Sequence, residues 1–252
     1  NENGTEEWTE LYTNILGNTN IAASGIDQTF DGGYIITGTA LDSLKSLLIK
    51  TDSLGNILWL KNYSITSRSY SIKQTNDQGY IFSGSSFNKV SVTKTDAIGL
   101  ILWSDTFSIT GISRGLCIQQ TNDGGYIIAG ITESSNIGNI TSFILKIDSL
   151  GNFEWQELLN LNWNEGGYVE QTNDGGYIIT GWAENTSGQQ LGMNTYLVKF
   201  DSTGVILWTK IFNGSASETG SQVQQTNDGG YAIIGTTTPN TTDAPTKVLL
   251  IK

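Results

Sequence analysis

Carboxylate side chains recur at two fixed places along this chain of 252 residues, and carboxylates are the groups that act in acid–base catalysis and in calcium binding. An identical residue in every repeat meets a need that every repeat shares. The Asx turn, in which an Asp side chain bonds its own backbone, is such a need. Asn-Asp-Gly-Gly also offers too few oxygen ligands for calcium. We therefore predict no catalytic residue, no metal site and no cofactor. The two sets are Asp31, Asp77, Asp123, Asp174 and Asp228, and Asp52, Asp96, Asp148 and Asp201.

The tryptophans fall into two groups, those that recur with the repeat and those that lie outside it. Trp163 and Trp182 do not belong to the repeat, and both are predicted in loops of its fourth copy, beside Glu165. A ring on a loop can stack on a pyranose face while polar neighbours fix the hydroxyls, so these residues are candidates for a saccharide or protein-partner site. The alternative, that the two rings fold over each other as loop anchors, stays open. The repeated group, predicted to pack between repeats, is Trp8, Trp59, Trp103, Trp155 and Trp208.

The elements that position these residues follow from an internal repeat. The phrase Gln-Thr-Asn-Asp-Gly-Gly-Tyr-Ile-Ile-x-Gly recurs with few changes, and a second phrase, typified by residues 48–59, follows its first four copies. After the fifth copy the chain stops at Lys252, where the second phrase is due. Residues 1–8 align without a gap on residues 52–59, so the start of the chain supplies the missing piece. The first phrase begins at Gln28, Gln74, Gln120, Gln171 and Gln225.

Each repeat predicts four antiparallel strands, from its alternating pattern, its β-branched and aromatic residues and its turn chemistry. In the second repeat we expect strands over 69–75, 79–86, 90–95 and 101–107. Five such repeats with a unit split across the termini predict an all-β, five-bladed β-propeller, a single domain over 1–252, closed by the N-terminal strand. A β-barrel or a β-prism is the alternative, but neither explains the split unit. The expected blades are 22–63, 68–107, 114–158, 166–212, and 220–252 together with 1–13.

The two phrases carry a family resemblance. Gln-Thr-x-Asp-Gly-Gly-Tyr-Ile-Ile-x-Gly followed by Ile-Lys-x-Asp-Ser-x-Gly-Asn-x-x-Trp resembles the propeller-type repeats of secreted and surface proteins of bacteria and archaea. The resemblance covers essentially the whole chain. It implies a β-propeller fold and an extracellular setting, and it does not assign a function, because a fold hosts many functions.

A third set of candidates lies six residues before each repeated Gln, where a propeller would place them around the mouth of its channel. Arg68 and Arg114 fall at this position in adjacent repeats, and Glu165 follows in the next. An Arg pair can clamp a carboxylate or phosphate of a ligand, so these three residues join the candidate ligand-binding set. The favoured alternative is a structural network in which the arginines satisfy Glu165 and Glu218.

The charge balance excludes one class of partner. The chain has 24 acidic and 13 basic residues and a net charge of −11, which repels the phosphate backbone of nucleic acids. No stretch of 18 apolar residues is present, so we expect no membrane insertion. The chain has no His, and its lone cysteine, Cys117, is expected to be a small buried hydrophobe.

Compartment and function follow from these patterns. A Thr-, Ser- and Asn-rich chain with one Cys predicts a secreted or cell-surface protein whose signal peptide has been removed. The function that we expect is a non-catalytic binding or adhesion module whose variable loops hold a saccharide or a protein partner. The alternatives are a structural subunit that self-assembles into an extracellular assembly or filament, and a glycoside hydrolase or lyase. Six candidate glycosylation sites are Asn3, Asn62, Asn139, Asn185, Asn213 and Asn240.

Overall fold

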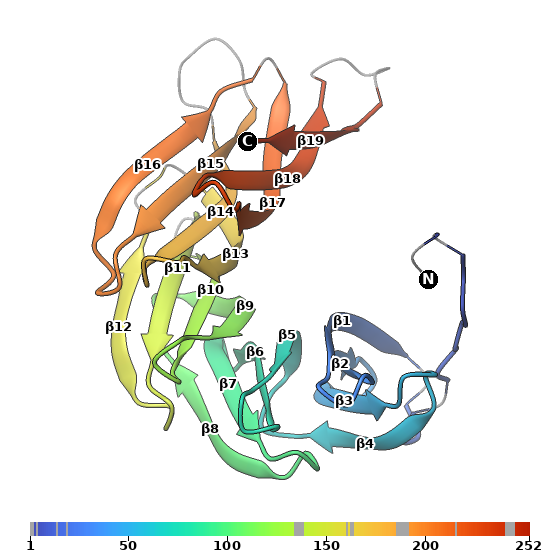
Figure 1. The fold of residues 1–252 in the computed structure, drawn as a ribbon. Coiled ribbons are helices and arrows are strands. Elements are labelled where there is room, and N and C mark those ends of the chain that lie inside the picture. The colour runs from blue at the N-terminus through green and yellow to red at the C-terminus, as the bar shows by residue number, and fades with distance from the viewer. Residues whose placement is uncertain are drawn as a thin grey trace. The chain divides into compact units, whose positions relative to one another are not determined.

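The fold is seen in a computed structural model that forms two compact units, Asn1–Phe107 and Ser108–Lys252 (Figure 1). We call them unit 1 and unit 2 and describe each by itself. The structure describes residues 3, 5–13, 15–18, 20–133, 139–159, 161, 164–184, 192–214, 216–239 and 245–252.

Both units consist of antiparallel sheets. Unit 1 holds the first sheet, β1-β2-β3-β4, and the second sheet, β5-β6-β7-β8. Unit 2 holds the third sheet, β9 to β12, the fourth sheet, β13 to β16, and the three-stranded fifth sheet, β17-β18-β19. The described residues contain no helix, and so none that could cross a membrane. The strands are β1 Ile21–Gln28, β2 Tyr34–Ala40, β3 Lys45–Thr51, β4 Ile57–Tyr63, β5 Arg68–Gln74, β6 Tyr80–Ser86, β7 Lys89–Thr95, β8 Ile101–Phe107, β9 Ile112–Gln120, β10 Tyr126–Glu133, β11 Ile140–Ile147, β12 Phe153–Leu158, β13 Asn164–Gln171, β14 Tyr177–Glu184, β15 Met193–Phe200, β16 Ile206–Phe212, β17 Ser217–Gln225, β18 Tyr231–Thr238 and β19 Lys247–Ile251.

The predicted all-β class is confirmed, and four of the five sheets have the predicted four antiparallel strands. In the second sheet each observed strand begins and ends within one residue of the range expected from the sequence. The accuracy comes from the turns, because each hairpin has a residue that tolerates a left-handed backbone. Gly32 has φ +83° in the first sheet, and Gln78 takes the same place in the second sheet with φ +67°.

The cores lie between neighbouring sheets. In unit 1 the strands β1 and β2 contact β5, and Ile35 and Leu48 of the first sheet are buried with Tyr80 and Phe82 of the second. In unit 2 the first strand of each sheet contacts the first strand of the next, β9 with β13 and β13 with β17. Each sheet therefore buries its apolar side chains against a neighbour.

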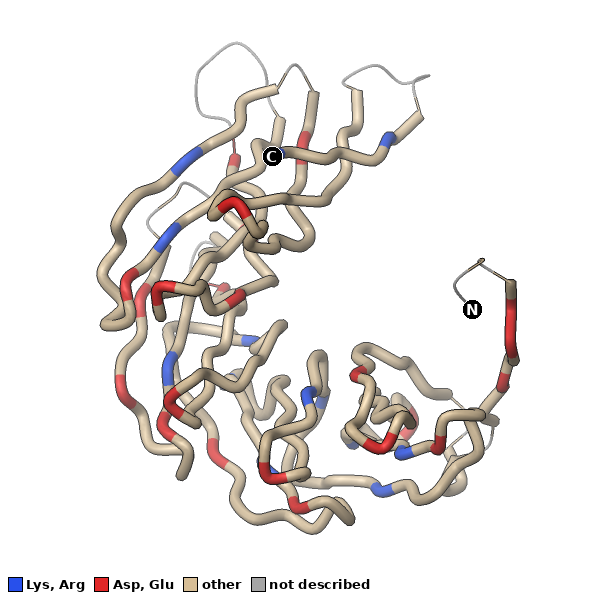
Figure 2. The backbone as a smooth tube through the Cα atoms, viewed as in Figure 1, with Lys and Arg blue, Asp and Glu red and all other residues tan. Residues whose placement is uncertain are grey.

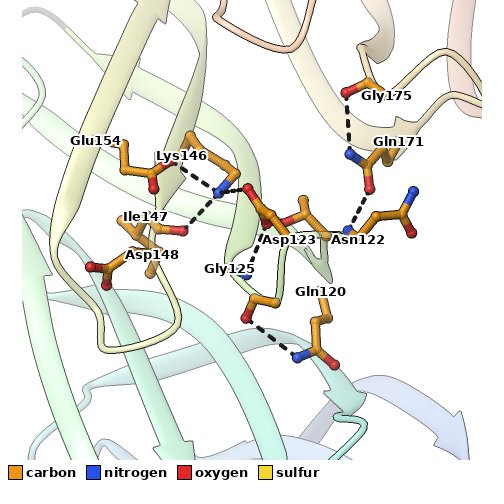
Figure 3. Close-up of polar contacts among 12 residues, drawn as sticks. Gln120, Asn122, Asp123, Gly125, Lys146, Ile147, Asp148, Glu154, Gln171 and Gly175 are labelled. Atoms are coloured by element: carbon orange, nitrogen blue, oxygen red, sulfur yellow. Dashed lines mark hydrogen bonds and ion pairs between the residues drawn. The ribbon is translucent and has the colours of Figure 1, made fainter.

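The repeated Gln joins neighbouring sheets near their first hairpins. Gln171 Oε1 accepts a hydrogen bond of 2.8 Å from Asn122 N–H of the third sheet, and Gln171 Nε2 donates to Gly175 O of its own hairpin (Figure 3). Gln74 and Gln225 accept the equivalent bond from the preceding sheet. The repeat thus carries its own sheet-to-sheet bond, which explains why this Gln recurs.

The N-terminal segment 5–13 lies in no strand, but it covers the first sheet of unit 1. The rings of Trp8 and Tyr34 are 5.9 Å apart at 64°, and those of Trp59 and Tyr80 are 5.8 Å apart at 61°. Tyr12 OH donates to Gly55 O just as Tyr63 OH donates to Gly99 O. Residues 8–12 therefore pack on the first sheet in the same way as β4 packs on the second sheet.

The fifth sheet has three strands, so β19 is an edge strand. The side chain of Lys252, which follows β19, is 59% exposed. The lysines at the same place in the other four sheets are 2–4% exposed, because a fourth strand with its Trp lies beside them. The four buried lysines are Lys50, Lys94, Lys146 and Lys199.

Candidate functional site

The repeated Asp of the first hairpin is occupied by bonds within its own sheet. Asp174 Oδ1 accepts from Thr172 Oγ1 at 2.5 Å, from Gly176 N–H at 3.0 Å and from Lys199 Nζ at 3.0 Å. The hydrogen bond from Thr172, followed by that from Lys199, lowers the pKa of Asp174 to about 2. This Asp therefore closes a turn and neutralises a buried Lys, which is the structural role expected from its recurrence. The same three kinds of partner surround Asp31 and Asp77.

The third sheet adds a second carboxylate to this arrangement. Lys146 Nζ lies 3.0 Å from Asp123 and 3.1 Å from Glu154, and it also donates to Ile147 O (Figure 3). The Lys146 side chain is 2% exposed, so its charge requires these partners. Acidic residues recur at hairpin ends in both units (Figure 2). Among the described residues, no group of three or more His, Cys, Asp or Glu side chains could hold a metal ion.

The turn carboxylates predict that acid unfolds the protein. A carboxyl whose pKa is lowered on folding contributes stability that is present above its unfolded pKa and is lost as pH falls through the folded value. For Asp31 and Asp174 this window runs from about pH 4 down to about pH 2. We expect the melting temperature to fall across this window, and Asp174→Asn to reduce the fall. A melting temperature that stays constant between pH 5 and pH 2 would contradict this assignment.

The structure brings two of the sequence-predicted site residues together. Trp182 lies in β14 rather than in a loop, directly opposite Glu165 of β13 and Thr195 of β15. Directly paired residues share one face of a sheet, so the side chains of Trp182 and Glu165 leave the same face of the fourth sheet. Both are half-buried. Trp163 lies outside the described residues.

Arg114 of unit 2 forms no ion pair with Glu165 among the described residues. Arg114 of β9 pairs with Ile131, whose other partner is Ser142, and Ser142 Oγ accepts from Tyr196 OH of the fourth sheet. Arg114 is thus on the face of the third sheet that is turned to the fourth. Arg68 is exposed at the start of β5 in unit 1.

Glu218 has a local partner instead of an arginine. It is buried in β17, and its Oε2 accepts from Gly214 N–H at 2.9 Å. A backbone amide therefore supplies the hydrogen bond that the arginine network was expected to supply.

The candidate glycosylation sites differ in accessibility. Asn3, Asn139 and Asn213 are exposed. Asn62 lies within β4, and its Oδ1 is buried and has no hydrogen-bond partner among the described residues. Asn185 and Asn240 lie outside the described residues.

A pocket of about 480 Å³ opens on the first strands of unit 2. Its polar wall is formed by Gln119 of β9, Tyr168 and Glu170 of β13, and Gln222 and Gln224 of β17. Its apolar wall is formed by side chains of the fifth sheet. These are Val223, Ala232, Ile233, Ile234 and Leu250.

Glu170 is the carboxylate of this pocket. Burial raises the pKa of Glu170 above its ordinary value, and a hydrogen bond from the backbone N–H of Gln225 partly offsets this effect. Burial also raises the pKa of Tyr168, whose phenol is hydrogen-bonded to the side chain of Gln119. A half-buried acid with a phenol and amides in a concave site can bind hydroxyl groups, or donate a proton while its carboxyl is protonated.

Reasoning from the sequence missed this pocket, although the repeat held a signal for it. The residue before the repeated Gln is polar in every repeat and changes from one repeat to the next. Variation at one position of an otherwise constant phrase marks a place where the repeats differ in role. The five residues are Asp27, Lys73, Gln119, Glu170 and Gln224.

Comparison with known proteins gives a fold. No protein-family model and no curated protein matches the chain. Among solved structures, the Dos1 propeller is similar with TM-score 0.58 and 14% identity, over 90% of this chain and 55% of that chain. The WD40 domain of Neurospora crassa Pan2 is similar with TM-score 0.54 and 13% identity, over 82% of this chain and 56% of that one. The fold is a β-propeller.

A third similar structure is an enzyme of matching size. The Penicillium chrysogenum α-L-arabinanase complexed with arabinobiose has TM-score 0.55 and 10% identity, over 90% of this chain and 92% of that chain. The β-propeller sheets of our chain span about half the length of the Dos1 and Pan2 chains. At these identities the likeness concerns the fold alone, so the function rests on the site.

Proposed function

We propose that this β-propeller is a non-catalytic module that binds a saccharide in the pocket on the first strands of unit 2. The observation that carries the proposal is the make-up of the polar wall, a single carboxylate with a phenol and three amides. Amides and a carboxylate match the donors and acceptors of neighbouring hydroxyls, and none of these groups is a nucleophile activated by a base.

A glycoside hydrolase is the second candidate, and Glu170 is the observation that favours it. A carboxyl with a raised pKa suits a general acid. Hydrolysis of a glycoside, however, needs a second carboxylate about 5–10 Å away on the other side of the bond. Glu170 is the only carboxylate among the described residues that line the pocket, which supports binding over turnover.

Calorimetric titration against neutral oligosaccharides tests the proposed function, and arabinan oligomers are a reasonable first probe because a structural neighbour holds arabinobiose. We expect binding without release of reducing sugar. Replacing Tyr168 or Gln119 by Ala removes hydroxyl partners and should weaken binding by about 1–2 kcal/mol. The matched control is Gln28→Ala in unit 1, which should bind like the parent. Release of reducing sugar that Glu170→Gln abolishes would establish the hydrolase instead.

We further propose that the propeller is a closed ring of five blades. Two observations support it, one in each unit. Residues 8–12 cover the first sheet as a fourth strand covers a neighbouring sheet, and β19 is an edge with an exposed Lys252. In the register of the other sheets, where Lys50 pairs with Trp59, Trp8 would pair with Lys252. Closure would cover Ile234 and Leu250, and with them Gln222, which pairs with Ile234. We therefore assign ligand binding to the part of the polar wall around Gln119, Tyr168 and Glu170.

The remaining expectations are part of the same proposal. A secreted or cell-surface location fits a saccharide-binding module, and Trp182 with Glu165 forms a second surface suited to a protein partner or to self-assembly. Cell fractionation with an antibody against the chain tests the location.

A further inference from the structure

Glu170 has a counterpart in unit 1, Asp27, which is paired with a cation. Asp27 occupies the same position of the repeat, directly before the repeated Gln. Gln74 N–H of the next sheet donates to Asp27 Oδ2 at 2.8 Å, and Gln225 N–H of the next sheet donates to Glu170. The two carboxylates therefore have the same backbone partner.

The two carboxylates differ in the charge beside them. Lys73 Nζ lies 2.8 Å from Asp27 Oδ1, so unit 1 supplies a cation from the following first strand. The residue that takes the place of Lys73 in the fifth sheet is Gln224, which is uncharged. No ion pair among the described residues includes Glu170.

A half-buried carboxylate without a cation is costly, and a ligand that brings a cation recovers part of that cost. Burial is the main cause of the raised pKa of Glu170, which agrees with this view. The geometry at Asp27 indicates where such a cation would sit, between the carboxylate and the next first strand. The acidic balance of the chain also attracts cations to it.

We propose that Glu170 binds the ammonium group of an amine-bearing saccharide, in the position that Lys73 holds beside Asp27. The amide of Gln119 and the phenol of Tyr168 are then left for the hydroxyls. This inference rests on the proposed saccharide-binding function and names the ligand class. A charge-assisted hydrogen bond is about twice as strong as a neutral one, so the amine is expected to dominate selectivity.

The test compares two probes that differ in one group, a trimer of β-1,4-linked glucosamine and its fully N-acetylated counterpart. Calorimetric titration is done at several pH values from mildly acidic to neutral, because the amine must be protonated while Glu170, whose pKa is raised by burial, must be ionised. We expect the amine trimer to bind at least about tenfold more tightly than the N-acetylated trimer. The ratio of the two affinities should fall as salt is added. Glu170→Gln should bring the ratio close to one.

A second variant copies the Lys73–Asp27 ion pair of unit 1 into the pocket. Gln224→Lys places beside Glu170 the cation that Lys73 places beside Asp27. It should therefore also bring the ratio of the two affinities, amine trimer over N-acetylated trimer, close to one. The melting temperature should not change, because Gln224 is exposed. Asp27→Asn alters the equivalent position outside the pocket and should keep the parental ratio. If the parent binds both trimers equally, the inference is wrong and the proposed function stands. If the parent binds neither these trimers nor the neutral oligosaccharides, both are wrong.

Discussion

A chain without residues 1–13 is expected to melt about 10 °C below the full chain. Removal of the segment uncovers Tyr34 and Gly55, against which Trp8 and Tyr12 lie, and loss of such aromatic packing costs about 3–5 kcal/mol. One kcal/mol corresponds to about 2–4 °C for a chain of this size. In the proposed closed ring the same deletion also leaves the β19 edge unpaired. Thermal unfolding followed by circular dichroism measures the effect.

Two further measurements make this prediction specific. Deletion of residues 1–4 alone keeps Trp8 and Tyr12 and should leave the melting temperature unchanged. Cysteines at Thr9 and Ile251, which face each other in the proposed register, should form a disulfide within one chain. A truncated chain as stable as the parent, or a disulfide that forms only between chains, would contradict closure by the chain's own strand.

Gly181→Ala is expected to lower the free energy of unfolding by about 3–5 kcal/mol. A Cβ on Gly181 would lie 2.2 Å from the carbonyl oxygen of Glu165 and 2.5 Å from Gly166 Cα. Both are backbone atoms of β13, so the strands must separate and their hydrogen bonds weaken. Urea unfolding of both proteins measures the difference.

The matched control is a glycine with ordinary space around it. A Cβ on Gly192 would lie 3.4 Å from Ser217 Oγ and 3.6 Å from Ala216 O, which is normal contact, so Gly192→Ala should change stability by less than about 0.5 kcal/mol. Equal losses for the two variants would show that the close approach of β13 and β14 does not explain the recurrent glycine.

The close approach explains a part of the repeat that the pattern alone left unexplained. The last glycine of the first phrase lies opposite a carbonyl of the first strand in every sheet, next to an irregularity in that strand's pairing. An added Cβ would lie 1.8–2.5 Å from that carbonyl oxygen. The glycines are Gly38, Gly84, Gly130, Gly181 and Gly235.

By itself, the sequence determined the strands, the hairpins and the structural role of the repeated acids. These features depend on residues close along the chain, such as Thr172, Asp174 and Gly176, whose bonds close one turn. Local chemistry of this kind is visible in the order of residues. The need for a Trp against a Tyr in each repeat was visible in the same way, because it recurs at a fixed spacing.

Only the tertiary structure decided the pocket and the partners of single residues. Glu170 stands out because Gln119 and Gln224, about 50 residues away on either side, lie beside it and bring no cation. Trp182 was expected in a loop, but the pairing of β14 with β15 extends beyond the repeated phrase and holds it in a strand. Arg114 and Glu165 occupy equivalent positions of the repeat, but they face different sheets. Arg114 is turned toward the fourth sheet, whereas Glu165 shares a face with Thr195, whose side chain lies beside Gly220 of the fifth sheet. Contacts between distant residues depend on which face of which sheet each side chain occupies, and the register of strand pairing sets that face.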